Sequence, residues 1–492
     1  MSTELLVSTD LLDPSRWSGK LYLEAWRPAP ERIATIEPAT GRELGTVGLA
    51  DAQTVRVASE AAVAAQREWA SRAPEERAAV LRRAGDLWLQ HAEEIKDWIV
   101  RESGSVRGKA DLEIHIAASE CFEASALPTM PTGEVLATGG DHWSFARRHP
   151  VGVVAVIAPF NFPLILAIRA VAPALALGNA VLLKPDPRTT VCGGVSIVRV
   201  FEEAGLPPGL LALVPGGADV GTALVEDPAV RVIAFTGSTR AGRVVAETAG
   251  RLLKRAHLEL GGNNALIVLP GADVEKAASA AAFGSYLHQG QICMTTGRHL
   301  VHTDIYDEYV SALSRKADRL RVGDPASGEF ELGPIIDENE LARIGTVVTN
   351  AVAAGARVAA GGRPDGAGYR PTVLVDLDVS NPAWTGEIFG PVAPVMRFST
   401  IDEAVEIANL SNYGLSASIL GDVGMAMRVA DRLDTGKVHI NEQTVMDEAV
   451  APFGGTKDSG NGGRIGGAAA NREAFTETQW VTVRGEIANY PF

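Results

Sequence analysis

The sequence predicts an α/β protein with a doubly wound, largely parallel sheet, and three observations lead to that prediction. Short runs of β-branched and other apolar residues recur along the chain, as in parallel strands buried on both faces. Segments with helical spacing separate these runs, which is the alternation of βαβ units. At 492 residues the chain is too long for one compact core, so two or three domains are expected.

Two helical patterns open the chain. A helix is expected from Asp51 to about Ala70, where apolar residues recur on one face. A second helix is expected from Pro74 to about Glu102 for the same reason.

The first series of strands follows, and the segments between the strands have helical character. The expected strands are Val151–Ile157, Ala180–Leu183, Leu211–Val214 and Val230–Phe235. The expected helices are Pro163–Leu177, Val195–Ala204 and Gly217–Val225. Ligands of such folds bind at the carboxyl edge of the strands, so we expect functional residues just after each strand.

A second α/β series begins near Asn264–Val268 and runs to about Gly466. It includes a helix that starts at Asp273 and a strand at Lys437–Ile440. The pattern changes near Glu259–Gly262, where we place the boundary between two domains.

Composition excludes several classes of partner. The formal net charge of −15 would repel nucleic acid and anionic membranes, so neither is expected as a partner. No apolar stretch approaches the length of a membrane span, and Met1–Val7 has no pattern of an export signal. The three cysteines form no CxxC motif or disulfide framework, which favours a reducing, cytoplasmic location. No metal site is expected.

Cys293 is the candidate nucleophile. It follows Gly290-Gln291-Ile292 and precedes Met294-Thr295-Thr296, a setting of small and polar residues that leaves a thiol approachable. Most lone cysteines are buried and inert, and we interpret Cys121 and Cys192 in that way. Cys293 needs partners before a catalytic role is favoured.

Two residues qualify as partners. Glu259 ends an apolar strand before Gly261-Gly262, where partial desolvation would raise its pKa toward that of a general base; otherwise it is a solvated strand-end carboxylate. Asn161 follows a buried strand, where it can cap the next helix, donate to an oxyanion, or do both. A thiol, a carboxylate and an amide are the groups that aldehyde oxidation through a thioester requires.

With these residues, three further segments resemble the aldehyde dehydrogenase superfamily over essentially the whole chain. They are Phe235–Gly242, Glu387–Pro391 and Pro452–Gly460. Within the superfamily the chain is most similar to bacterial benzaldehyde dehydrogenases. The segments that carry this narrower resemblance are Leu287–Met294, Gly261–Asn264, Pro215–Gly221 and Ala488–Phe492.

The resemblance implies an aldehyde dehydrogenase fold with three parts. They are a Rossmann-like cofactor domain (1–126 and 149–259), an α/β catalytic domain (260–466) and a small β arm for oligomerisation (127–148 and 467–492). The tail alternates apolar and polar residues at Trp480–Arg484, which suits an added strand. A homodimer or homotetramer is therefore expected.

The resemblance also implies NAD as cofactor. Gly237–Gly242 lacks the middle glycine of GxGxxG, but the family places its pyrophosphate at this turn, with Ser238 and the helix N-terminus facing the phosphate. Lys184 would bind the adenosine ribose and Glu387 the nicotinamide ribose, beside Phe389. The other expected cofactor residues are Pro159, Phe160, Gly217, Gly221, Gly237, Gly242 and Leu260.

One departure from the family leaves NADP open. Many NAD-preferring members carry a glutamate three residues after the lysine, and here that position is Pro187. Loss of the carboxylate removes a ribose acceptor and the charge that would repel a 2′-phosphate.

The implied reaction begins with attack of the Cys293 sulfur on the aldehyde carbon. The Asn161 amide and the backbone N–H of Cys293 hold the oxyanion, hydride leaves to the nicotinamide, and Glu259 activates the water that hydrolyses the thioester. A thiol esterase, using Cys293 and Glu259 without redox chemistry, is the alternative of a different class.

The expected substrate is an aromatic aldehyde such as benzaldehyde, with vanillin-type, aliphatic and semialdehyde substrates as alternatives. Family position places an apolar and aromatic wall around the acyl pocket. Its expected members are Phe162, Ile292, Met294, Phe453 and, nearby, Arg169. Arg169 is either paired structurally or faces a polar ring substituent such as a phenolic hydroxyl.

Overall fold

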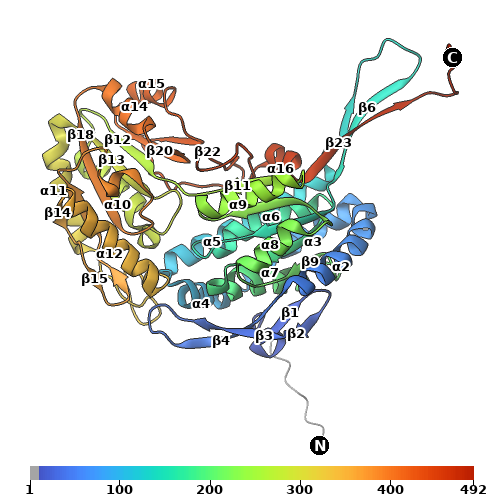
Figure 1. Ribbon diagram of the computed structural model, residues 1–492, viewed down its shortest axis with the longest axis horizontal. Helices are drawn as coiled ribbons and strands as arrows, with labels where there is room; N and C mark the ends of the chain where they lie inside the picture. The colour runs from blue at the N-terminus through green and yellow to red at the C-terminus, as the bar shows by residue number, and fades with distance from the viewer. Residues whose placement is uncertain (1–9) are drawn as a thin grey trace, which may run out of the picture.

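The computed structural model describes residues 10–492, and its largest elements are two seven-stranded sheets (Figure 1). The first has the order β11-β10-β7-β8-β9-β1-β2, with parallel pairing from β11 to β9 and an antiparallel edge at β1 and β2. Its strands are β1 (Lys20–Tyr22), β2 (Trp26–Pro28), β7 (Val153–Ile157), β8 (Ala180–Lys184), β9 (Leu211–Leu213), β10 (Val230–Thr236) and β11 (Arg255–Glu259).

Two groups of helices pack on this sheet: α2 with α8 and α9, and α6 with α3, α5 and α7. They are α2 (Ala52–Ser71), α3 (Pro74–Gln90), α5 (Arg107–Ala126), α6 (Pro163–Ala176), α7 (Ser196–Glu203), α8 (Ala218–Glu226) and α9 (Thr239–Arg251). The strands between them are buried along almost their whole length. The predicted doubly wound α/β fold is confirmed.

Two sequence-based element boundaries were wrong. The helix expected from Pro74 to Glu102 is interrupted at His91 (φ −101°, ψ 21°), after which α4 (Ala92–Ser103) begins. Apolar residues keep helical spacing on both sides of His91 and hide the break. The strand expected from Val151 starts at Val153, because Gly152 has φ 115°, outside the β region.

The second sheet has the order β14-β17-β18-β13-β12-β20-β21 and is parallel except at the edge strand β14. Its strands are β12 (Asn264–Val268), β13 (Thr296–His302), β14 (Arg357–Ala360), β17 (Thr372–Val375), β18 (Val392–Phe398), β20 (Ser416–Leu420) and β21 (Lys437–Ile440). The helices of this half are α10 (Val274–Tyr286), α11 (Tyr306–Arg319), α12 (Glu338–Ala353), α13 (Pro382–Thr385), α14 (Ile401–Asn409) and α15 (Val423–Ala430). The expected helix start at Asp273 is confirmed, since the Asp273 side chain caps α10.

The chain crosses from one sheet to the other between the last residue of β11, Glu259, and the first residue of β12, Asn264. The pattern change at Glu259–Gly262 therefore marks a real change of sheet. The division of the chain into three domains stays a prediction.

A three-stranded antiparallel sheet extends from the body of the molecule (Figure 1). It consists of β5 (Gly133–Val135), β6 (Trp143–Pro150) and β23 (Thr476–Val483), which follows α16 (Ala468–Phe475). Large apolar side chains on this arm stay in solvent, and Val135, Trp143 and Trp480 are 82%, 74% and 70% exposed.

The remaining elements are short or lie at the edges. They are α1 (Pro14–Trp17), β3 (Glu31–Ile36), β4 (Glu43–Leu49), β15 (Pro364–Asp365), β16 (Gly368–Tyr369), β19 (Tyr413–Gly414) and β22 (Thr456–Lys457). No helix within residues 10–492 combines the length and the apolar character needed to span a bilayer. Met1–Val7, in which no export signal was expected, lies outside the described residues.

Candidate active site

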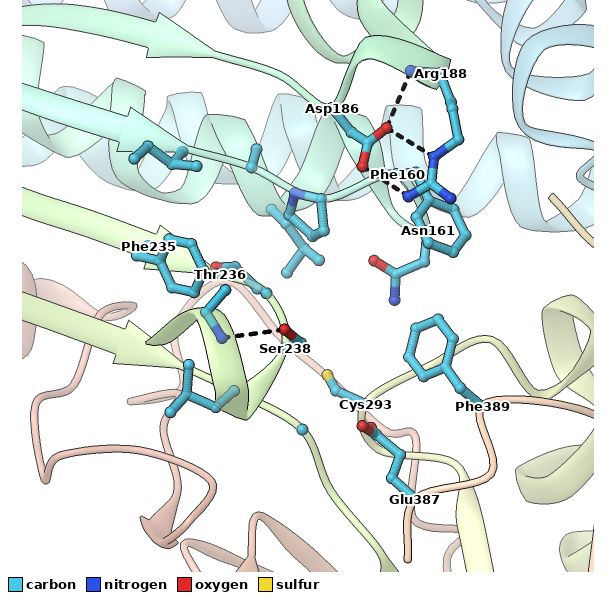
Figure 2. A pocket seen from close by; sticks show the side chains of 18 of the residues that line it. Phe160, Asn161, Asp186, Arg188, Phe235, Thr236, Ser238, Cys293, Glu387 and Phe389 are labelled. Carbon is cyan, nitrogen blue, oxygen red and sulfur yellow. Dashed lines mark hydrogen bonds and ion pairs between the residues drawn. The ribbon is translucent and has the colours of Figure 1, made fainter. Parts of the chain in front are cut away.

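A cavity of about 450 Å³ lies at the carboxyl edge of the first sheet and is closed by loops of the second (Figure 2). Cys293 and Asn161 line it together, and in Figure 2 the thiol and the amide both face its open centre. Most of the expected cofactor residues line the same cavity: Pro159, Phe160, Lys184, Gly237, Ser238, Leu260, Glu387 and Phe389.

The loop before Cys293 has an unusual backbone. His288 and Gln289 have φ of 49° and 56°, and Gly290 continues the left-handed run at 68°. A Cβ on Gly290 would lie 2.2 Å from the carbonyl oxygen of Gly390, so only glycine permits this contact. The Cys293 loop is thereby pressed against the loop that carries Phe389.

The Cys293 backbone is also held from the second sheet. The Asn264 side-chain amide donates to the Cys293 carbonyl at 2.8 Å, and a Cβ on Gly262 would lie 2.2 Å from the same oxygen. Burial raises the pKa of the Cys293 thiol to about 12, and the positive charge of Lys437 opposes that rise.

Asn161 is buried and is anchored through its own backbone. Its carbonyl accepts a 2.7 Å hydrogen bond from the Lys109 ammonium, which forms a fully buried ion pair with Glu113. The capping interpretation of Asn161 is wrong. The N-cap of α6 is Phe162, and the Glu113 carboxylate accepts the backbone N–H of Leu164 at 3.1 Å in place of a side-chain cap. The Asn161 amide is left to face the cavity.

Glu259 ends β11 and is only 7% exposed, which excludes a solvated strand-end carboxylate. Neither of its carboxylate oxygens has a hydrogen-bond partner among the described residues. Burial raises its pKa to about 8, against the opposing charges of Arg464 and Lys437. The side chain borders a separate small cavity of about 20 Å³, enough for one water molecule.

Arg169 is paired structurally, which was the first of the two alternatives expected from the sequence. Its Nε donates to Glu120 at 2.8 Å, and its Nη2 lies 2.8 Å from a carboxylate oxygen of Asp447. The guanidinium lies 5.0 Å from the ring centre of Phe453. Two carboxylates thus neutralise a cation that would otherwise be buried alone.

The expected acyl-pocket residues meet in one apolar cluster. Ile292, Met294 and Phe453 are buried together with Leu415, and Cys293 packs against them. Phe162, Leu287 and Val445 complete the cluster at its partly buried side.

Three of the expected cofactor residues, Gly217, Gly221 and Gly242, do not line the cavity. Gly242 lies in the first turn of α9, where a Cβ would stand 2.2 Å from Leu260 Cδ2. Gly221 faces Lys184, with 3.9 Å from a Cβ there to Lys184 Cε, and Gly217 is the N-cap of α8. Ser238 caps α9 by accepting the Ala241 N–H.

Two charged residues of the cavity wall, Lys184 and Glu387, are buried or desolvated. Lys184 is buried at the end of β8, its side-chain amine makes no hydrogen bond or ion pair with residues 10–492, and burial lowers its pKa. Glu387 accepts the Gly262 N–H at 3.0 Å, and burial raises its pKa to about 7. Phe389, at φ 52°, packs edge-on against Phe160 with ring centres 5.9 Å apart.

Sequence reasoning missed several residues of the site. Asp186 and Arg188 line the cavity as an ion pair, and Arg188 also binds Asp337 at 2.7 Å. Their place directly after β8 was the available signal. Lys109 and Lys437 gave no such signal, because each reaches the site from a distant element. No group of three His, Cys, Asp or Glu side chains in the described chain is placed to hold a metal.

Comparisons with known proteins agree with this geometry. Residues 26–481 match the aldehyde dehydrogenase family. The chain is 62% identical to a vanillin dehydrogenase of an Amycolatopsis species, over 98% of this chain and 99% of that one. It is 47% identical to a benzaldehyde dehydrogenase [NAD(+)] of Pseudomonas putida, covering 97% and 98% of the two chains.

Among solved structures, a salicylaldehyde dehydrogenase from Pseudomonas putida G7, complexed with salicylaldehyde, superposes with a TM-score of 0.93. The identity is 36%, and the match covers 96% of this chain and 99% of that one.

Proposed function

Because the chain belongs to the aldehyde dehydrogenase family, we propose that it oxidises aromatic aldehydes to carboxylic acids with NAD as cofactor. Cys293 is the nucleophile, Asn161 the oxyanion donor and Glu259 the base of this proposal. The observation that carries it is the joint placement of the Cys293 thiol and the Asn161 amide on one cavity, with an unpartnered Glu259 close behind.

The first half of the reaction forms a bond between the Cys293 sulfur and the aldehyde carbon. The resting thiol is protonated at neutral pH, because its pKa is about 12, so it releases its proton to solvent water as the sulfur attacks. The carbonyl oxygen becomes an oxyanion, which accepts hydrogen bonds from the Asn161 amide and the Cys293 backbone N–H. When bound, the nicotinamide supplies the acceptor for the hydride that leaves this carbon.

The second half hydrolyses the thioester. Glu259 draws a proton from water, and the hydroxide adds to the acyl carbon. The bond between this carbon and the Cys293 sulfur then breaks, which forms the carboxylic acid. A pKa of about 8 leaves part of Glu259 ionised at neutral pH and most of it above pH 8. Its two unpartnered oxygens are free to take up this water.

The cavity residues fit a nicotinamide dinucleotide. The unpartnered Lys184 amine and the buried Glu387 carboxylate are a donor and an acceptor for ribose hydroxyls, and the N-terminus of α9 suits the pyrophosphate. We assign NAD as the cofactor because the Pseudomonas putida relative is named a benzaldehyde dehydrogenase [NAD(+)]. Pro187 presents no carboxylate against a 2′-phosphate, so NADP is tested beside NAD.

The apolar cluster around Cys293 supports an aromatic substrate. An aryl ring would contact Phe162 and Phe453 and bury more apolar area than acetaldehyde, which favours it by a few kcal/mol at ~25 cal/mol per Å². The names of the relatives agree with both the benzaldehyde and the vanillin-type alternatives.

The proposal extends to assembly and location. The exposed apolar residues of the arm, including Trp143 and Trp480, suit burial against another copy of the chain in a homodimer or homotetramer. The three cysteines are unpaired, in keeping with a reducing cytoplasm.

The test is a spectrophotometric assay at the absorbance band of reduced nicotinamide, with benzaldehyde, vanillin and propanal, each with NAD and with NADP. Reduction of the cofactor with an aromatic aldehyde, at a higher kcat/KM than with propanal, is expected. Turnover of a nitrophenyl ester without any aldehyde oxidation would instead identify a thiol esterase.

A further inference from the structure

Lys437 is a charged residue that the proposed chemistry does not use. It begins β21, and its ammonium lies 2.6 Å from the sulfur of Met294 and 4.0 Å from the ring centre of Phe453. Both contacts belong to the apolar cluster around Cys293. The ammonium therefore contacts the apolar cluster that we propose packs around the substrate ring.

This ammonium lacks the neutralising carboxylate that two other buried cations near the site, Lys109 and Arg169, have. Lys109 is paired with Glu113, and Arg169 is held by Glu120 and Asp447. Within residues 10–492, the Lys437 ammonium has no carboxylate within ion-pair distance, and the only hydrogen-bond partner of that ammonium is the Met294 thioether sulfur. A thioether is a weak acceptor, and the ring face of Phe453 offers a weak attraction only.

The carboxylates around Lys437 act on it from a distance and do not contact its ammonium. The groups acting on Lys437 are Asp447, Cys293, Arg169 and Glu259, together with the neighbouring His439. Asp447 contacts Arg169 instead, while Cys293 and most of Glu259 are protonated at pH 7. Removal from water lowers the pKa of Lys437, because burial without a contacting anion disfavours the charged ammonium relative to the neutral amine.

We propose that the Lys437 ammonium binds a phenolate oxygen on the ring of the substrate, so that the preferred aldehydes are hydroxybenzaldehydes taken in their ionised form. The inference rests on the proposed function and narrows its substrate class. A phenolate oxygen supplies the anionic acceptor that the ammonium lacks, while the aryl ring packs against Phe453 and Met294. An unsubstituted ring leaves the ammonium without an acceptor.

The first test compares kcat/KM for 2-, 3- and 4-hydroxybenzaldehyde with that for benzaldehyde, in the wild type and in Lys437→Met. The kcat/KM for hydroxybenzaldehyde, divided by that for benzaldehyde, should fall at least about tenfold in Lys437→Met for at least one isomer. A loss of this size is expected when a hydrogen bond to a charged group is removed. Lys437→Arg should restore part of the ratio, because it keeps the charge. Any effect of Lys437 on the Cys293 thiol cancels in this ratio.

The second test does not depend on turnover. In Cys293→Ala, which cannot bond to the aldehyde, binding of a hydroxybenzaldehyde near neutral pH should produce the long-wavelength absorbance band of the phenolate. The apparent pKa of the bound phenol should be lower than in solution and should rise when Lys437→Met is added. Lys276→Met, which removes an exposed lysine on α10, is the control and should change neither the ratio nor the spectrum.

The outcomes separate this inference from the proposed function. In Lys437→Met, kcat/KM could fall equally for benzaldehyde and every hydroxybenzaldehyde, with no change in the absorbance spectrum of the bound hydroxybenzaldehyde. That result would overturn the phenolate site and leave aromatic aldehyde oxidation standing. If the wild type oxidised no aromatic aldehyde, the proposed function itself would fail.

Discussion

The Asn264 side-chain amide donates 2.8 Å hydrogen bonds to two carbonyls, those of Cys293 and Thr295. Asn264 is the first residue of β12 in the second sheet, whereas Asn161 and Glu259 follow strands of the first. The proposed nucleophile is thus held from one sheet, and its two proposed partners are held from the other.

Cys293→Ala should reduce both aldehyde oxidation and ester hydrolysis by several orders of magnitude, because no other thiol reaches the cavity. NAD binding, measured by the quenching of protein fluorescence, should persist. Cys121→Ala and Cys192→Ala are matched controls, since both thiols are buried away from the cavity. Loss of chemistry in a folded Cys192→Ala variant would contradict the assignment.

Glu259→Gln should release one equivalent of reduced cofactor and then stall, because the base acts mainly in hydrolysis of the thioester. The wild-type steady-state rate should rise with pH, with a midpoint near pH 8 and a plateau above about pH 9, as the carboxyl with a pKa of about 8 loses its proton. The variant should lack this rise. Rapid-mixing absorbance across pH 6 to 9.5 measures both effects, and an unchanged steady-state rate in the variant would remove Glu259 from the mechanism.

Asn161→Ala should lower kcat by ~10²–10³-fold, the usual loss for one oxyanion donor. The amide side chain makes no hydrogen bond that caps α6, so the fold should lose little stability. Kinetics and thermal unfolding of the same preparation test the two statements together. A variant that kept its kcat would show that the Asn161 amide does not hold the oxyanion.

Gly242→Ala should weaken NAD binding, because the new methyl group would push Leu260, a residue of the cavity wall, toward the cofactor. Gly250→Ala provides the control in the same helix, since nothing lies within 4 Å of its Cβ. Gly250→Ala should leave the Kd unchanged and stabilise α9 by about 0.5–1 kcal/mol. Calorimetric titration with NAD compares the two variants, and equal Kd values would refute the packing argument.

Trp480→Glu should weaken self-association, because it places a charge among the exposed apolar residues of the arm. Met427→Glu is the comparison: Met427 is 52% exposed on α15, at the other end of the molecule from the arm (Figure 1). Sedimentation velocity at micromolar concentration should show a smaller species for Trp480→Glu alone. A monomeric wild type would contradict the proposed assembly.

Sequence patterning predicted the strands of the first sheet well, because buried parallel strands are continuous apolar runs with few competing interpretations. It failed at His91, where the apolar spacing of two helices continues across a break in the backbone. Helical periodicity reports which face is buried and does not report a single residue that leaves the helix.

The site was predictable where its residues follow strands directly. Lys184 and Glu259 end β8 and β11, Asn161 lies in the loop after β7, and these parallel strands all end at the same edge of the first sheet. Lys109 and Lys437 were not predictable. Lys109 reaches Asn161 from a helix 52 residues away, and Lys437 contacts Met294 across 143 residues, so only the folded chain brings these charges to the site.

The contact between Gly290 and Gly390 makes one mechanical unit of two loops. We expect a displacement of Glu387 and Phe389 by a dinucleotide to move the Cys293 loop as well, because no side chain separates Gly290 from the Gly390 backbone. Cofactor binding and the position of the Cys293 sulfur are then coupled through the main chain. The rate at which an alkylating reagent modifies Cys293 should therefore change when the cofactor binds.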